Sequence, residues 1–209
     1  MAASLKDLNK WPLLAAILAN FAVFYVAMKT NSLLGGARAE LLAALNEAIP
    51  AGIALVLIGV ANAQLSSSMK ARIVFTRWDN PMPGREAFSR LATEDDRIDF
   101  AALDKLHGPF PTAPQEQNTR WYQLYKSVEN HPSVGQVHRE FLFTRDYTCL
   151  AVMMFIVLGG VGLYQIPSLN TALIYIGLMA AQVIVVDRAA RNHGRRFVTT
   201  VLALKSAGK

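Results

Sequence analysis

Four long stretches with almost no charge decide what this chain can fold into. Each is close to the roughly 20 residues that an α-helix needs to cross about 30 Å of hydrocarbon. Apolar residues make up 53% of the 209 residues and charged residues only 17%, so a soluble fold would have too little polar sequence to cover four such helices. We therefore expect four transmembrane helices, at about residues 11–28, 43–64, 147–166 and 169–186.

The first stretch also invites comparison with a secretory signal peptide, because Lys6 and Lys10 precede it. A signal peptide has an apolar region of about 7 to 15 residues that ends at a cleavage site with small residues. This stretch is longer and has no clear site of that kind, so we expect it to remain as a transmembrane helix. The single cysteine, Cys149, lies in the third stretch and can form no disulfide within one chain.

The basic residues predict the orientation, because Lys and Arg collect on the cytoplasmic side of a membrane. After the fourth stretch the chain holds six basic residues against the single acid Asp187: Arg188, Arg191, Arg195, Arg196, Lys205 and Lys209. The connection between the third and fourth stretches, residues 165–171, has no charge. With four spans, both termini and the polar middle of the chain are expected on the cytoplasmic side.

This layout predicts an all-α, polytopic membrane protein with four transmembrane helices and a small helical cytoplasmic domain between spans two and three. The expected segments are a transmembrane hairpin at 1–65, the cytoplasmic domain at 66–146, a second hairpin at 147–186 and a basic tail at 187–209. The tail is expected to contact anionic lipid headgroups, with about 1 kcal/mol for each basic residue near the surface; the candidates are Arg188, Arg191, Arg195 and Arg196.

Two arrangements of the tail stay open. Phe197, Val201 and Leu204 recur at helical spacing, which fits an amphipathic helix along the membrane or a helix packed on the cytoplasmic domain. Because the basic residues adjoin a span instead of covering one face of a domain, no nucleic acid is expected as a partner.

Helix signals divide the cytoplasmic segment. Span two is expected to continue as a helix past Ser66 to about Thr76, before Pro81 and the turn that follows it end the helix. A short helix is expected at about residues 86–91, and Asp99 as N-cap with Gly108 as C-terminal stop predicts another between them.

Two capping boxes predict the remaining helices. Thr112 with Gln115 favours a helix over about 114–129, and Ser133 with Gln136 favours one that runs without a break into span three. In the first of these helices one face carries an apolar stripe of Trp121, Leu124, Tyr125 and Val128. Both ends of the cytoplasmic domain are thus expected to join their spans as continuous helices.

The chain shows no sign of enzymatic chemistry. It has no phosphate-binding glycine loop, serine elbow or zinc-binding helix motif. Its four histidines, His107, His131, His138 and His193, have no cysteine or acid at metal-ligand spacing. We therefore expect no enzyme activity, no metal and no cofactor.

Charged residues near the membrane supply other candidates. Asn46 and Glu47 are candidates for a path through the membrane, because ionisable residues within a span are costly unless they serve a function. The start of span three carries four charged residues, Arg139, Glu140, Arg145 and Asp146. They form either a charged gate or ordinary ion pairs on a helix surface. Four helices enclose no pore of their own, so a conducting protein would be a homo-oligomer.

The turn-rich segment after residue 76 supplies candidates for binding a cytoplasmic protein partner, namely Trp78, Arg85, Phe88, Trp121 and Tyr125. The alternative is that this segment serves only packing and turn formation.

A resemblance rests on a set of short motifs in the cytoplasmic segment. These are Trp78, Pro81, Pro83-Gly84, Ala87-Phe88-Ser89, Arg97-Ile98-Asp99, Gln117-Asn118, Trp121-Tyr122, Leu124-Tyr125 and Arg145-Asp146-Tyr147. With them the chain resembles an uncharacterised family of small bacterial inner-membrane proteins, which implies a bacterial inner (plasma) membrane. The four-span layout is similar to that of membrane components of anti-phage systems, such as KwaA of Kiwa.

Two functions follow from this reading. In the first, an oligomeric sensor or effector, for which the resemblance suggests anti-phage defence, alters membrane permeability when its cytoplasmic domain engages a partner or ligand. In the second, a non-conducting anchor recruits a soluble partner to the membrane. An intramembrane enzyme ranks third, because no acid-base pair or nucleophile with its base lies at membrane depth.

Overall fold

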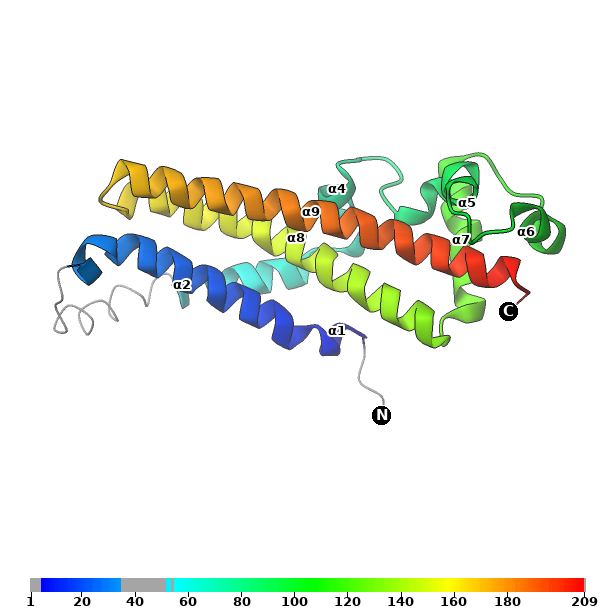
Figure 1. Cartoon of the computed structure of the whole chain (residues 1–209), viewed down its shortest axis with the longest axis horizontal. Helices are drawn as coiled ribbons and strands as arrows, with labels where there is room; N and C mark the ends of the chain where they lie inside the picture. The colour runs from blue at the N-terminus through cyan, green and yellow to red at the C-terminus, as the bar shows by residue number, and fades with distance from the viewer. Residues whose placement is uncertain (1–4, 35–51, 54, 209) are drawn as a thin grey trace. The chain divides into compact units, whose positions relative to one another are not determined.

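The computed structural model describes residues 5–34, 52, 53 and 55–208 (Figure 1). Every regular element among these residues is a helix, which confirms the predicted all-α class. The elements are α1 Leu5–Leu8, α2 Lys10–Leu34, α4 Ser67–Phe75, η1 Pro83–Glu86, η2 Ala87–Leu91, α5 Ala92–Glu94, α6 Phe100–His107, α7 Pro114–Val128, α8 Pro132–Gln165 and α9 Leu169–Ser206. Of the two η elements, η1 is a 3-10 helix and η2 a π-helix.

Three of the described helices, α2, α8 and α9, are long and apolar enough to span a membrane. They contain the stretches predicted as spans one, three and four. The predicted second span, at about 43–64, lies largely outside the described residues, and its described part includes the shorter apolar helix Leu55–Gln64. The chain therefore has helices suited to a membrane, and the fourth span stays a prediction.

The chain divides into two compact units. We call Met1–Asn9, Ser66–Arg145 and Arg188–Lys209 the helical domain, and Lys10–Leu65 with Asp146–Asp187 the membrane unit. The residues predicted as a separate basic tail thus belong to the helical domain, as the C-terminal part of α9.

The membrane unit carries apolar side chains both in its interior and on its surface. Phe24, Leu150 and Met154 are buried in its core. By contrast, Ile156 and Val185 are each 66% exposed. Exposed large apolar side chains along helices of this length fit a surface that faces lipid, where contact with hydrocarbon replaces contact with water.

Aromatic residues build the core of the helical domain. Trp121 and Tyr125 of α7 meet the ring of Phe197 edge-on, at 5.1 and 5.2 Å between ring centroids. Val201 is fully buried in the same core, and Leu204 packs against it. Of the two arrangements considered for the tail, packing on the helical domain is the one that the structure shows.

Two of the helix signals acted as predicted and two did not. Asp99 caps α6 by accepting a hydrogen bond from the backbone N–H of Ala102 at 2.9 Å, and Gly108 is its C-cap. The predicted capping boxes at Thr112 and Ser133 are wrong. Instead α7 and α8 each begin with a proline, Pro114 and Pro132, which suits the first helical position because the N–H that proline lacks would have no partner there.

The predicted continuation of span two to about residue 76 is also wrong. Ser66 has an extended backbone (φ −62°, ψ 155°), and its hydroxyl accepts a hydrogen bond from the N–H of Met69 at 3.1 Å. Serine favours this N-cap role over a place inside a helix. A separate helix, α4, therefore begins at Ser67.

The predicted continuity at the other end of the domain is confirmed. α8 runs unbroken from Pro132 to Gln165, and α9 from Leu169 to Ser206 (Figure 1). Each of the two helices contributes residues to both units.

Candidate anion-binding site

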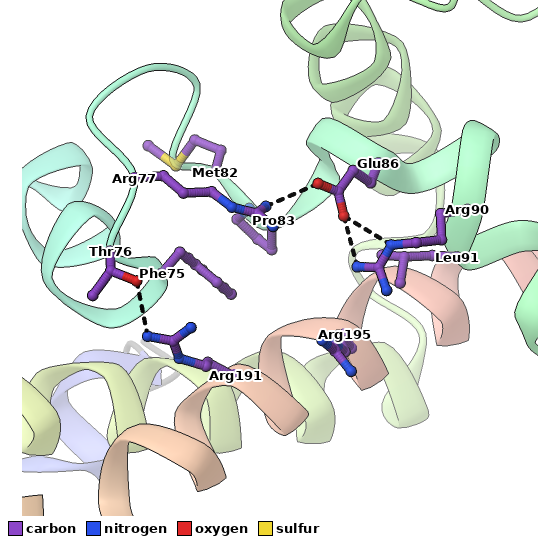
Figure 2. A pocket seen from close by; sticks show the side chains of 10 residues that line it. All are labelled: Phe75, Thr76, Arg77, Met82, Pro83, Glu86, Arg90, Leu91, Arg191 and Arg195. Carbon is purple, nitrogen blue, oxygen red and sulfur yellow. Dashed lines mark hydrogen bonds and ion pairs between the residues drawn. The ribbon is translucent and has the colours of Figure 1, made fainter. Parts of the chain in front are cut away.

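A pocket of about 290 Å³ in the helical domain concentrates arginines from distant parts of the chain. Four segments line it: the end of α4, the loop after it, η1 with η2, and α9 (Figure 2). We call it the arginine pocket; its lining residues are Phe75, Thr76, Arg77, Met82, Pro83, Glu86, Arg90, Leu91, Arg191 and Arg195.

Local backbone features bring these segments into place. Thr76 ends α4 in the left-handed conformation, with φ at 50°, so the chain turns away before Arg77. Pro83 takes the first position of η1, where its fixed φ favours helical geometry. Glu86 and Arg90 follow at a spacing of four residues, which places their side chains on one face.

Two glycines allow the close packing around the pocket. A Cβ on Gly84 would lie 2.7 Å from Cε3 of Trp121, so only glycine lets η1 approach α7 this closely. A Cβ on Gly194 would lie 2.9 Å from Cζ of Phe75, at the place where α9 meets α4. Glycine at both positions therefore allows η1 to pack closely on α7 and α9 to pack closely on α4.

Glu86 joins the arginines of η2 and of the loop after α4. Its Oε2 accepts hydrogen bonds from Nη2 and Nε of Arg90 at 2.6 and 2.9 Å. Its Oε1 lies 3.0 Å from Nη1 of Arg77 and 3.3 Å from Nε of Arg85. The carboxylate thus holds two pocket arginines in fixed positions (Figure 2).

The two arginines of α9 face the same pocket. The guanidinium of Arg191 donates a hydrogen bond to the hydroxyl of Thr76 at 3.2 Å. Arg195 is exposed and, among the residues that the structure describes, its side chain has no hydrogen-bond or ion-pair partner. It is therefore available to a ligand.

The electrostatics of the pocket favour an anion. Partial burial of Glu86 favours its neutral form, but the hydrogen bond from Arg90 and the charges of Arg77, Arg90 and Arg85 outweigh it, so the pKa of Glu86 lies below its ordinary value of 4.5. For Arg90, burial would lower the pKa, but the hydrogen bond and charge of Glu86 raise it. At neutral pH four guanidinium groups line the pocket with one carboxylate, and Glu94 contacts Arg90 from outside the lining at 3.4 Å, so the lining itself stays positively charged.

A buried glutamine fixes the backbone at the start of η2. Gln117 is 1% exposed, and its Oε1 accepts hydrogen bonds from the N–H groups of Phe88 and Ser89, each at 3.1 Å. Its Nε2 donates to the carbonyl of Thr112 at 2.7 Å. The side chain thus anchors the first turn of η2, which carries Arg90. The sequence contains a signal for this role, because Gln117 lies four residues before Trp121, on the buried face of α7.

None of the four gate candidates lines the arginine pocket. Asn46 and Glu47 lie outside the described residues. Arg139 donates from Nε to the side-chain oxygen of Asn9 at 3.3 Å. Arg145 is 5% exposed, with its guanidinium 5.9 Å from the centroid of the Phe141 ring.

The two acids among the gate candidates belong to different units. Glu140, in the helical domain, accepts a hydrogen bond from Gln136 at 3.1 Å and lies 3.3 Å from Nδ1 of His193 and 3.8 Å from Arg196. Asp146 is half-buried and is counted with the membrane unit. The gate stays a prediction.

The partner-binding candidates divide between core and surface. Phe88, Trp121 and Tyr125 are buried, at 4, 3 and 8% exposure, so they cannot offer a partner the surface expected of them. Trp78 is 75% exposed, with the guanidinium of Arg72 5.8 Å from its ring centroid. Arg85 stays near the surface and donates to the carbonyl of Asp79 at 3.3 Å.

The four arginines expected to contact lipid have different environments. Arg191 and Arg195 line the arginine pocket, whereas Arg196 lies 3.8 Å from Glu140. Arg188 is exposed. In the sequence these four arginines form one basic cluster. The pocket does not show there, because the arginines that face α9 lie about a hundred residues earlier in the chain.

Comparison of the chain with protein-family models, curated proteins and solved structures finds no match. The resemblances to small bacterial inner-membrane proteins and to KwaA of Kiwa therefore stay predictions.

Proposed function

We propose that this protein is a membrane-embedded sensor of a bacterial inner membrane, whose helical domain binds a ligand and thereby changes the permeability of the membrane. The continuity of α8 and α9 supports the proposal. Each helix has one part in the helical domain and an apolar part in the membrane unit. A packed helix can carry a shift at one end to the other, because bending it sharply would break its backbone hydrogen bonds.

The arginine pocket supplies the ligand-binding end of this proposal. Two of its four arginines, Arg191 and Arg195, lie on α9. A ligand that binds them contacts a helix that also belongs to the membrane unit. Such a ligand shifts the equilibrium between two conformations only as far as it binds one of them more tightly.

The experiment interrupts α9 between its two parts. Ala189→Pro removes a backbone hydrogen bond and introduces a steric clash, at a cost of about 3 kcal/mol in a helix interior, whereas Ala189→Ser leaves the helix intact. Both variants and the wild type are expressed in bacteria that carry a membrane-potential dye, and the amount of each in the membrane is measured. We expect depolarisation with the wild type and Ala189→Ser, and none with Ala189→Pro at equal abundance.

Wild-type expression that leaves the potential unchanged would contradict the permeability proposal. It would favour the second candidate, an anchor that recruits a soluble partner. The exposed indole of Trp78, in an open pocket of about 480 Å³, supports that candidate. Co-purification of a partner that is lost in Trp78→Ala and kept in Tyr122→Ala would support it further. Tyr122 is the matched control, because its aromatic side chain is 50% exposed and lies outside that pocket.

A further inference from the structure

We propose that the arginine pocket binds a phosphate group. The proposal names the class of ligand that the helical domain binds, and it rests on the proposed function for the consequence of binding.

The charge and chemistry of the pocket select this class of ligand. Four arginines and one glutamate line it, so a neutral or cationic ligand would leave the excess positive charge unbalanced. A guanidinium presents planar pairs of N–H groups that match two oxygens of a phosphate. A hydroxyl on Thr76 adds a further polar group to the wall.

The arginines are held ready for a ligand. Glu86 fixes Arg77 and Arg90 with contacts of 3.0 and 2.6 Å, so these side chains lose little further freedom when an anion binds. One carboxylate lines the pocket beside four guanidinium groups, and Glu94 contacts Arg90 from outside the lining at 3.4 Å. Arg195 has no partner among the described residues and lies on the α9 wall, which makes it the side chain that a ligand engages anew.

The size of the pocket suits one or two phosphate groups. A volume of about 290 Å³ corresponds to about ten water molecules at roughly 30 Å³ each. Among the described residues that line the pocket, Phe75 alone carries an aromatic ring. The contacts are therefore expected to be with the phosphate and not with a large ring system.

Two sources of phosphate have the same chemistry here. One is a small soluble phosphate compound, and the other is the headgroup of an anionic phospholipid. Arg191 and Arg195 follow the last residue of the predicted fourth span, Val186, by five and nine residues. Basic residues this close to a span can reach headgroups, so the experiment has one arm for each source.

The test uses the full-length protein in a neutral detergent for the first arm. Inorganic pyrophosphate and inorganic phosphate are titrated by calorimetry into the wild type, Arg195→Gln and Arg188→Gln. Arg188 is the matched control, because it lies on the same helix, is exposed and does not line the pocket. Both substitutions remove one positive charge from the surface.

The second arm measures lipid retention. The same three proteins are placed in bilayer nanodiscs of phosphatidylcholine with and without phosphatidylglycerol. The phosphatidylglycerol that stays bound after extraction is counted by native mass spectrometry. If a headgroup fills the pocket, pyrophosphate should also bind more weakly in the discs that contain phosphatidylglycerol.

We expect one arm to show binding. Arg195→Gln should weaken the affinity about tenfold or more, because a hydrogen bond between charged groups is lost. The affinity of Arg188→Gln should stay within about twofold of that of the wild type. Arg195→Lys, which keeps the charge but not the planar fork, should fall between them. Binding of neither probe, or equal weakening by Arg195→Gln and Arg188→Gln, would overturn the proposal.

The two proposals can fail separately. If no phosphate source binds but the wild type still depolarises membranes, only the ligand is wrong. If phosphate binds through Arg195 but changes no membrane property, the pocket stands and the sensor function falls.

Discussion

Replacement of Gln117 by leucine tests whether one buried amide organises the wall of the arginine pocket. The substitution keeps a side chain of similar size but leaves the N–H groups of Phe88 and Ser89 without their acceptor. A buried donor left without a partner costs about 1–3 kcal/mol. The N–H of Phe88 is buried and that of Ser89 only partly so, hence a loss of about 2–4 kcal/mol is expected.

The control is Gln123→Leu on the same helix. Gln123 is exposed and accepts one hydrogen bond from Arg120 at 3.1 Å, so its loss should cost within about 0.5 kcal/mol. Gln117→Glu keeps an acceptor for the two N–H groups but loses the donor to the carbonyl of Thr112. It should therefore fall between the other two.

Hydrogen–deuterium exchange of the full-length protein measures the effect locally. Because about 1.4 kcal/mol changes an equilibrium tenfold, amides in residues 83–94 of Gln117→Leu should exchange about 30-fold faster or more. Peptides of α9 beyond residue 197 serve as an internal reference for global unfolding. Exchange in Gln117→Leu no faster than in Gln123→Leu would refute the role assigned to Gln117.

Three further predictions concern the same domain. Gly84→Ala should destabilise it by about 1–3 kcal/mol, because the new Cβ would lie 2.7 Å from Trp121. Gly135→Ala, whose new Cβ would meet no atom within 4 Å, should stabilise it by about 0.5–1 kcal/mol. Thermal unfolding measures both, and stability changes of the same sign in the two variants would contradict this prediction. Asp99→Ala should cost about 1 kcal/mol by removing the cap of α6, and faster exchange confined to that helix would show it. The pKa of Glu86 is lowered on folding, so its ion pairs stabilise the domain above its ordinary pKa of 4.5, and this contribution is lost as the pH falls through the lower folded-state value. On acidification, the thermal unfolding midpoint of Glu86→Gln should therefore fall less than that of the wild type. Midpoints that fall equally with pH in both proteins would argue against this role of Glu86.

Local signals predicted much of the fold. The apolar stretches gave three membrane-length helices, and Asp99 with Gly108 gave the bounds of α6. These features depend on residues close together in the sequence. The break at Ser66 was missed because serine tolerates a helix interior yet favours an N-cap, and only the hydrogen bond to Met69 decides between the two.

The site was harder to predict than the fold. Glu86 and Arg90 form an i, i+4 pair that the sequence alone suggests. Arg195 lines the same pocket as Glu86 and Arg90 because α9 packs against α4. Gly194 permits this close packing. Phe88, Trp121 and Tyr125 were expected at a binding surface, but the aromatic side chains of a small domain are needed in its core.

Ion flux from proteoliposomes tests the central claim most directly, because it measures ligand binding and membrane permeability in one experiment. Wild-type protein and Arg195→Gln are reconstituted at equal density, with and without pyrophosphate on the side of the helical domain. The account predicts that pyrophosphate changes the flux through the wild type and leaves Arg195→Gln unchanged. A flux that is the same with and without pyrophosphate, or that responds equally in both proteins, would contradict it.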